Sequence, residues 1–269
     1  MTPHRPLRLL QLTDPHLFAD PDGEIYGVRT DGTFRAALAR AFDSTPDPVD
    51  ALLVTGDIAE DGLPATYQRF HDLVASLGVP VLCIPGNHED RDTMAAILDR
   101  PPVQFCGALR LPGWRIVMLD SHLPGLDEGR LGTEELQRLE GELDHAADEN
   151  VLVCLHHPPV PVGSPWLDAF GLVNGDALLS CLAERGSVRG VLFGHVHQES
   201  DQLHGGLRML STPSTCAQFT PRTERCIMDL RPPGFRRLEL WPDGRIDTEV
   251  VWLEELRRSE RPPDSRQPD

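Results

Sequence analysis

Five short clusters of potential metal ligands recur along the chain. They are Asp14-Pro15-His16, Gly56-Asp57, Gly86-Asn87-His88-Glu89, His156-His157 and Gly194-His195-Val196-His197. Two of the five directly follow a short apolar run, and the other three begin two residues past one. Short apolar runs bounded by turn residues predict buried strands. The fold must therefore carry these polar side chains at its strand ends.

The apolar runs alternate with segments that predict helices. Strands are expected at 7–12, 51–55, 80–84, 114–119, 151–155 and 188–193, and helices at 31–42, 64–77, 91–99, 133–146 and 174–185. This alternation predicts sheets covered by helices. In open α/β sheets the carboxyl ends of parallel strands form the crevice where ligands bind, so the clusters are expected to converge there.

The pattern changes beyond residue 205. Short β segments are expected at 207–210, 225–230, 235–241 and 247–252, with turns such as Pro232-Pro233-Gly234 between them. This change implies a second sheet. Residues 254–269 are charged and lack an apolar pattern, which predicts a disordered tail. The expected organisation is one domain over residues 1–253 followed by this tail.

The number of candidate ligands indicates two metal ions. A single catalytic ion usually takes three or four protein ligands. Seven candidates are available: Asp14, His16, Asp57, Asn87, His156, His195 and His197. If Asp57 bridges, one ion takes Asp14, His16, Asp57 and His197, and the other takes Asp57, Asn87, His156 and His195. Two ions about 3.5–4 Å apart can clamp the attacking and leaving oxygens of a phosphoryl displacement, which indicates phosphoester hydrolysis.

Two ligand pairs are spaced two residues apart, Asp14 with His16 and His195 with His197. On an extended chain such residues project to the same side, so each pair is expected to grip one region of space. Pro15 is expected to restrict Asp14 to extended conformations. Taken singly, each pair is better explained by a turn cap and ordinary polar residues at a strand end. The five clusters together favour the metal interpretation.

These motifs resemble those of the calcineurin-like metallophosphoesterases, over about residues 7 to 198. The resemblance narrows to the bacterial class III 3',5'-cyclic AMP phosphodiesterases through Leu12-Thr13-Asp14-Pro15-His16-Leu17-Phe18, Trp166-Leu167-Asp168, Gly194-His195-Val196-His197-Gln198-Glu199 and Thr212-Pro213-Ser214-Thr215-Cys216. Asp-Pro-His stands where Asp-Thr-His or Asp-Leu-His is more usual, and Asn-His-Glu replaces Asn-His-Asp. Glu89 is therefore left outside the predicted site.

The resemblance implies a four-layer αββα sandwich, in which two mixed β-sheets pack face to face with helices outside. It also implies a dinuclear phosphodiesterase that converts 3',5'-cyclic AMP to 5'-AMP, with Asp57 between the ions and His156, rather than His157, as a ligand. Ligands of the His, Asp and Asn types suit Fe, Mn or Zn, and Fe or Mn is favoured.

His88 is the predicted general acid. A histidine with a pKa near 6.5 can give a proton to the departing sugar oxygen or, as an imidazolium, stabilise phosphoryl charge. A histidine that merely packs beside the site is the alternative. Asn87 joins His88 as a predicted catalytic residue. The residues expected to contact the substrate are His16, Asp57, Asn87, His88 and His197.

Two other functions stay open. The same metal core serves many substrates, so a broader phosphodiesterase acting on glycerophosphodiesters or other nucleotide diesters is one alternative. A non-catalytic scaffold with this fold is the other, but it would be expected to have lost ligands that this chain retains.

The charge and the cysteines restrict the partners and the compartment. The 25 basic and 42 acidic residues give a net charge of −17, which disfavours nucleic acid and anionic membranes as partners and leaves a small nucleotide as the expected one. Cys83 and Cys154 lie within apolar runs, where reduced thiols pack as small hydrophobes. No run approaches the length of a membrane helix, and no signal-peptide pattern is present. We expect a cytoplasmic protein, with the oligomeric state open.

Overall fold

The computed structural model describes residues 5–44 and 47–253, and its first sheet has six strands. Their order is β16 (Ile246–Trp252), β15 (Gly234–Leu240), β1 (Leu7–Leu12), β4 (Ala51–Thr55), β5 (Val81–Ile84) and β6 (Val103–Phe105). The strands β1, β4, β5 and β6 are parallel to one another. β15 pairs in antiparallel fashion with β1, and β16 pairs in antiparallel fashion with β15. The sheet is therefore mixed, as the resemblance implied.

The second sheet also has six strands. Their order is β11 (Ser200–His204), β12 (Leu207–Ser211), β10 (Val188–Phe193), β9 (Asn150–Cys154), β8 (Trp114–Met118) and β7 (Gly107–Leu111). The strands β12, β10, β9 and β8 are parallel, and an antiparallel strand lies at each edge. This sheet is mixed as well.

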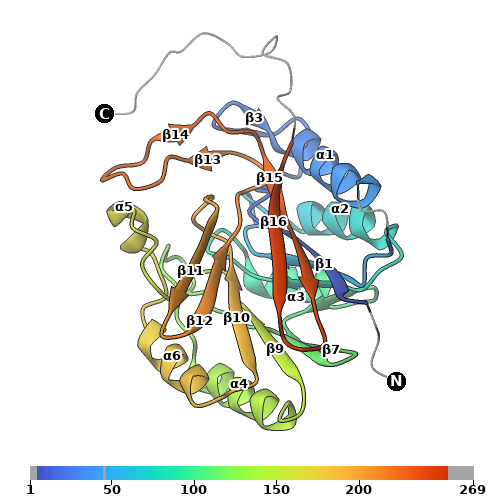
Figure 1. Ribbon diagram of the computed structural model, residues 1–269. Coiled ribbons are helices and arrows are strands. Elements are labelled where there is room, and N and C mark those ends of the chain that lie inside the picture. The colour runs from blue at the N-terminus through green and yellow to red at the C-terminus, as the bar shows by residue number, and fades with distance from the viewer. Residues whose placement is uncertain (1–4, 45–46, 254–269) are drawn as a thin grey trace.

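Helices cover the outer face of each sheet (Figure 1). The first sheet packs against α1 (Thr30–Asp43), α2 (Pro64–Ala75) and α3 (Arg91–Leu98), and the second against α4 (Thr133–His145) and α6 (Gly175–Ala183). Between the sheets, buried side chains such as Leu9, Leu53 and Leu152 form a third core. The predicted four-layer αββα sandwich is confirmed.

The second sheet implied by the change of pattern beyond residue 205 is present, but the late strands are divided between the two sheets. β15 lies beside β1 in the first sheet, and β12 lies beside β10 in the second. The apolar pattern of a strand reports which face is buried but not which strand lies next to it. The strand expected at 225–230 is limited to Met228–Asp229, and the expected tail 254–269 lies outside the described residues.

Short elements missed by the sequence analysis surround one end of the sandwich. They are the hairpin of β2 (Glu24–Ile25) and β3 (Val28–Arg29), the hairpin of β13 (Gln218–Phe219) and β14 (Met228–Asp229), and α5 (Pro165–Asp168). Strands of two residues are too short to show a period. Figure 1 shows both hairpins at the same end as α5.

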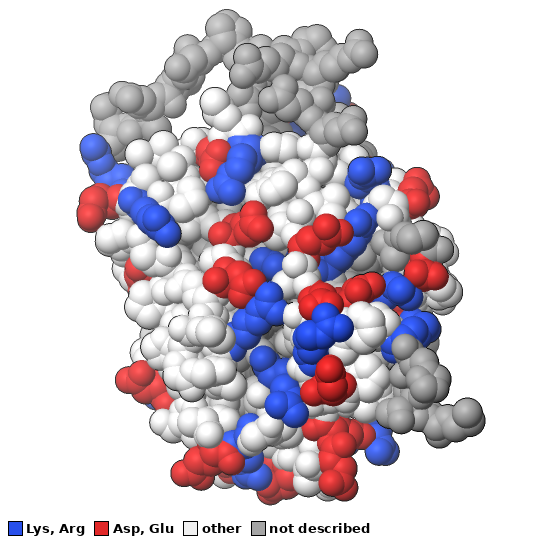
Figure 2. Space-filling view, viewed as in Figure 1, with Lys and Arg blue, Asp and Glu red and all other residues white. Residues whose placement is uncertain are grey.

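Acidic and basic side chains alternate on the face shown in Figure 2. Across the β15–β16 pair, Arg237 lies directly opposite Glu249, and their side chains form an ion pair of 2.9 Å. On β11 and β12, Arg208 pairs with Asp201 at 2.6 Å. The net charge of −17 is therefore not spread as one continuous acidic field over this face.

Candidate metal centre

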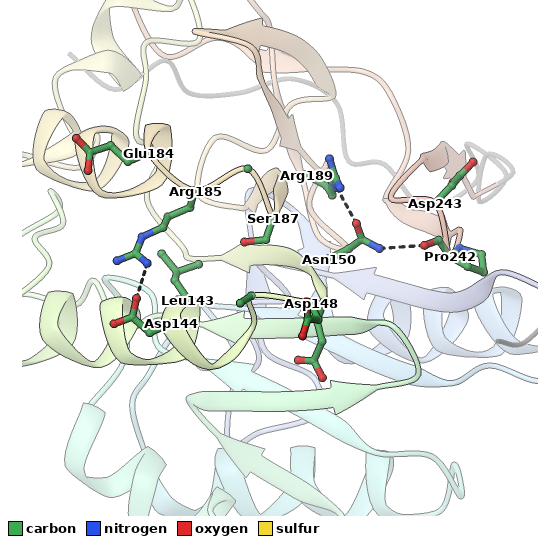
Figure 3. A pocket seen from close by; sticks show the side chains of 13 residues that line it. Leu143, Asp144, Asp148, Asn150, Glu184, Arg185, Ser187, Arg189, Pro242 and Asp243 are labelled. Atoms are coloured by element: carbon green, nitrogen blue, oxygen red, sulfur yellow. Dashed lines mark hydrogen bonds and ion pairs between the residues drawn. The ribbon is translucent and has the colours of Figure 1, made fainter. Parts of the chain in front are cut away.

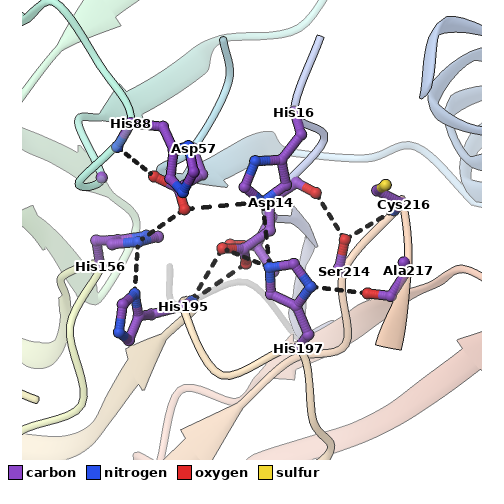
Figure 4. A network of polar contacts seen from close by, with 12 residues as sticks. Asp14, His16, Asp57, His88, His156, His195, His197, Ser214, Cys216 and Ala217 are labelled. Atoms are coloured by element: carbon purple, nitrogen blue, oxygen red, sulfur yellow. Dashed lines mark hydrogen bonds and ion pairs between the residues drawn. The ribbon is translucent and has the colours of Figure 1, made fainter. Parts of the chain in front are cut away.

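All seven predicted ligands converge where the loops after β1, β4, β5, β9 and β10 meet. Figure 4 shows the side chains of Asp14, His16, Asp57, His156, His195 and His197 gathered there. His16 Nε2 lies 3.2 Å from His197 Nε2, and His195 Nδ1 lies 3.3 Å from His156 Nε2. The amide oxygen of Asn87 is 3.2 Å from His156 Nε2 and 3.0 Å from His195 Nδ1. The convergence expected at the carboxyl ends of the parallel strands is thus present.

Asp57 lies between the two groups of imidazoles. Its Oδ2 atom is 3.8 Å from His16 Nε2 on one side and 3.4 Å from His156 Nε2 on the other. Asp14 belongs to the first side, where its Oδ1 is 3.4 Å from His197 Nε2. This position suits a carboxylate that two ions would share.

Three of the imidazoles form a hydrogen bond with an acceptor on the side that faces away from the centre. His156 Nδ1 lies 2.7 Å from the Thr55 carbonyl oxygen, and His197 Nδ1 lies 2.7 Å from that of Ala217. His16 Nδ1 lies 2.8 Å from a Glu60 carboxylate oxygen. Each Nδ1–H therefore donates outward, which turns the Nε2 lone pair toward the centre, as metal-binding histidines require.

Facing lone pairs at this separation repel each other unless a cation or proton lies between them. Among the described residues, His195 Nε2 and His157 Nε2 are also buried without a hydrogen-bond partner. The set combines imidazole nitrogens with carboxylate and amide oxygens, which suits Fe, Mn or Zn. The residues therefore fit a dinuclear metal centre.

The local potential favours positive charge. Burial opposes ionisation, yet His197 and His156 hold the pKa of Asp14 below its usual value. Against the same burial penalty, His156, His88 and His16 lower the pKa of Asp57 well below its ordinary value. Burial and the neighbouring His156 lower the pKa of His195 to about 3. Ionised carboxylates and a neutral His195 suit metal binding. Against the burial penalty, Asp57 raises the pKa of His156 to about 9, so this imidazole would have to release a proton when a metal binds.

Five of the seven predicted ligands lie in left-handed backbone, with φ of 51° at Asp14, 48° at His16, 51° at Asp57, 68° at His195 and 49° at His197. The expectation of extended pairs, and of an extended Asp14 before Pro15, was therefore wrong. The loops instead turn sharply where they leave the sheet, and the amides of Asp14 and His16 donate to Gly56 and Asp57 carbonyls. Non-glycine residues rarely adopt this conformation, and such strain gathers at functional sites.

A glycine precedes the functional side chain in three of the clusters because the space is filled. A Cβ at Gly56 would lie 2.3 Å from His156 Nδ1, and one at Gly86 would lie 2.1 Å from Asp57 Oδ1. A Cβ at Gly194 would meet Thr13 Oγ1 at 2.1 Å. These glycines let neighbouring loops approach closely enough for their ligands to share one centre.

Two carboxylates that the sequence analysis did not place in the site support it. Glu60 lies 2.8 Å from His16 Nδ1 and 2.9 Å from His88 Nδ1. Burial opposes ionisation of Glu60, but these two hydrogen bonds lower its pKa to about 2. The buried Glu89 carboxylate accepts hydrogen bonds from the backbone amides of Asp57, Ile58, Ala59 and Gly86. It thereby ties the loop after β4 to the loop after β5.

His88 and His157 stand apart from the seven. The side chain of His88 is 34% exposed, and its imidazole contacts that of His16 edge-on at 4.8 Å between ring centres. His157 is fully buried, and its Nδ1 lies 2.8 Å from Ser121 Oγ. His156, not His157, approaches Asp57 and Asn87, which favours the predicted choice between them.

A family model described as calcineurin-like phosphoesterase matches residues 7–199. The chain belongs to this family. The predicted resemblance is confirmed, and with it the predicted class of enzyme, a metal-dependent phosphodiesterase. The phosphoesterase is 38% identical over 248 residues to the 3',5'-cyclic adenosine monophosphate phosphodiesterase CpdA of Vibrio vulnificus, covering 92% of this chain and 90% of the relative.

Other relatives agree. The protein of the same name from Escherichia coli strain K12 is 38% identical over 252 residues, covering 93% of this chain and 91% of the relative. A dimetal phosphatase from Danio rerio has a TM-score of 0.66 at 16% identity, covering 92% of this chain and 99% of that one, which shows the fold. In the described part of the phosphoesterase, no helix has the length and apolar character needed to cross a bilayer.

Proposed function

We propose that this phosphoesterase hydrolyses 3',5'-cyclic AMP to 5'-AMP. One observation carries the proposal: the seven side chains predicted to bind metal come from five loops and meet in one buried centre, with the partly exposed His88 beside it. The names of the relatives from Vibrio vulnificus and Escherichia coli support cyclic AMP as the substrate. A scaffold that had lost catalysis would have no need for this convergence.

In this proposal Asp14, His16, Asp57 and His197 would hold one ion, and Asp57, Asn87, His156 and His195 the other. Iron or manganese is proposed ahead of zinc. When bound, two such ions supply Lewis acidity toward the phosphoryl oxygens and lower the pKa of water. His16, Asp57, Asn87, His88 and His197 would surround the bound phosphodiester.

His88 would supply the proton for the departing 3' oxygen. Burial lowers the pKa of His88, but the hydrogen bond to Glu60 and the charge of Asp57 raise it to about 10, so the imidazole is protonated at neutral pH. Because Glu60 accepts from Nδ1, Nε2–H is the group left to donate to the substrate. Asn87 directs its amide oxygen to His156 and His195, which leaves its NH₂ group to donate to a phosphoryl oxygen.

The experiment combines metal analysis with turnover. Purified protein is expected to hold about two ions per chain, to produce 5'-AMP rather than 3'-AMP, and to lose activity on chelation. Its kcat/KM for cyclic AMP is expected to exceed that for glycerophosphodiesters and for cyclic GMP. A higher value for a glycerophosphodiester would contradict the proposed substrate while keeping the reaction class.

We further propose that the enzyme works on its small nucleotide substrate in the cytoplasm. The free thiols of Cys83 and Cys154, buried in β5 and β9, support a reducing compartment.

A further inference from the structure

A row of aromatic side chains leads outward from the metal centre. The His197 ring stacks on Phe219, with 4.7 Å between ring centres and 20° between ring planes. Phe219 in turn meets Trp166 edge-on at 5.1 Å and Tyr26 edge-on at 6.0 Å. The three rings beyond His197 come from β13, α5 and the turn between β2 and β3. Three segments distant in sequence thus build one apolar wall beside a proposed ligand.

Tyr26 is the most exposed member of the row. Its exposure is 56%, whereas that of Phe219 is 7%. Burial of part of the phenol raises the pKa of Tyr26, and the charges of Cys226, Glu60 and Cys216 raise it further. Tyr26 contacts Phe219, and Phe219 stacks on the proposed ligand His197, so Tyr26 lies on the rim of the centre and not on a remote surface.

The backbone at Tyr26 is one that tyrosine adopts rarely. Ile25 pairs with Val28, and the two residues between them have φ of 52° at Tyr26 and 74° at Gly27. Positive φ at both positions defines a type I′ hairpin turn, in which Asn-Gly or Gly-Gly is strongly preferred. A bulky residue held there costs stability, and the large exposure of the ring shows that packing does not compensate for it. Function is the remaining reason for an aromatic residue at this tip.

We infer that Tyr26, with the edge of Phe219 behind it, is the face on which the nucleobase of the substrate stacks. The inference rests on the proposed function, because only a nucleotide phosphodiester carries a base. A neutral aromatic platform can hold an uncharged base beside the anionic phosphate without adding charge. Stacking on aromatic side chains is a general and sequence-tolerant way to bind bases.

The test uses Tyr26→Asn, because asparagine suits this turn better than tyrosine does. The variant is expected to keep or raise the melting temperature while the KM for cyclic AMP rises about tenfold, or about 1.4 kcal/mol, with little change in kcat. The KM for ribose 3',5'-cyclic phosphate, which has no base, is expected to stay the same. Tyr26→Phe should behave as the wild type because it retains the ring.

Leu203→Asn is the matched control. Leu203 is 78% exposed near the β11–β12 turn, and β12 runs parallel to β10, so this turn lies at the end of the sheet opposite the centre. Neither KM should change in this variant. An unchanged KM for cyclic AMP in Tyr26→Asn, or an equal rise for both substrates, would overturn the inference.

Binding of products separates this inference from the proposed function. By calorimetry, the wild type is expected to bind 5'-AMP about tenfold more tightly than ribose 5-phosphate, and Tyr26→Asn should lose that preference. If the wild type prefers 5'-AMP to ribose 5-phosphate but does not hydrolyse cyclic AMP, the proposed function is wrong. The assignment of Tyr26 as the face that binds the base is then retained. If cyclic AMP is hydrolysed without any preference for 5'-AMP, the base face is wrong.

Discussion

Two polar regions lie at opposite ends of the second sheet, and only one resembles a catalytic site. A hollow of about 680 Å³ opens at the amino ends of β9 and β10, beside the ends of α4 and α6 (Figure 3). In it Arg185 pairs with Asp144, and Asn150 accepts from Arg189 at 2.7 Å and donates to the Pro242 carbonyl at 3.2 Å. The metal centre is at the carboxyl ends of the same two strands.

The two regions differ in whether their polar groups have hydrogen-bond or ion-pair partners. In the hollow, opposite charges and hydrogen-bond partners meet in solvent. At the centre, imidazole lone pairs face one another, and His157 Nε2 and His195 Nε2 are buried without partners among the described residues, whereas no such atom lines the hollow. Concavity alone is therefore a poor guide, and buried unsatisfied ligands on left-handed backbone are a better one.

The largest expected effect comes from Asp57→Ala at the centre. The change removes the carboxylate that lies between the two imidazole groups, so metal content should fall substantially and activity should nearly vanish. Metal analysis and cyclic AMP turnover measure both. Full metal occupancy with normal turnover would show that Asp57 is needed for neither metal binding nor catalysis. The predicted functional difference between the centre and the hollow would then be lost.

His88→Ala is expected to separate chemistry from metal binding. His88 is outside the proposed ligand sets, so both ions should remain while turnover of cyclic AMP falls roughly 10²–10⁴-fold. Bis(p-nitrophenyl) phosphate releases a phenolate that needs little protonation, so its hydrolysis should suffer much less. Equal losses for both substrates would exclude the general-acid role, and loss of an ion would place His88 among the ligands.

Glu60→Gln should shift the pH dependence of kcat. The Glu60 carboxylate raises the pKa of His88, and a general acid must be protonated, so activity is lost as pH rises through that pKa. Without the carboxylate this pKa falls, and the alkaline limb of the profile should move to lower pH. Metal content must be measured alongside, because Glu60 also holds His16. An unmoved limb with both ions present would show that Glu60 does not set the proton on His88.

The smallest effect is expected in the hollow. Arg185→Ala breaks an ion pair whose side chains are 35% and 63% exposed, and such surface pairs contribute little to stability because solvent screens them. Turnover and metal content should equal those of the wild type, and the melting temperature should fall little. A clear loss of turnover would mean that the two ends of the sheet communicate.

The sequence predicted the strands, the helices that cover them and the position of the ligands because these depend on local patterns, whereas the face-to-face packing of two sheets was implied by the family resemblance. Apolar runs such as Val151–Leu155 show where strands end, and the residue types that follow them show what chemistry is possible there. The assignment of the individual ligands and of His88 stays a prediction until these variants are measured.

The rest depended on neighbours distant in sequence. Glu60 in Gly56-Asp57-Ile58-Ala59-Glu60 has the pattern of a solvated turn residue, and only the fold brings it against His88. Glu89 was left outside the predicted site, yet its carboxylate gathers four backbone amides from two loops. The left-handed backbone at Asp14 could not be foreseen either, because it depends on hydrogen bonds to the loop after β4.

The central position of β1 in the first sheet determines how late during translation that sheet can be completed. β1 ends at residue 12, but the strand that covers its second edge begins only at residue 234. At 5–20 residues per second this leaves the edge open for roughly 10–40 s, and an open edge invites pairing with other chains. The carbonyl that orients His197 belongs to Ala217, so a nascent chain shorter than this has no complete centre. The proposed ligand set and the carbonyl that orients it therefore exist together only after most of the chain has been translated.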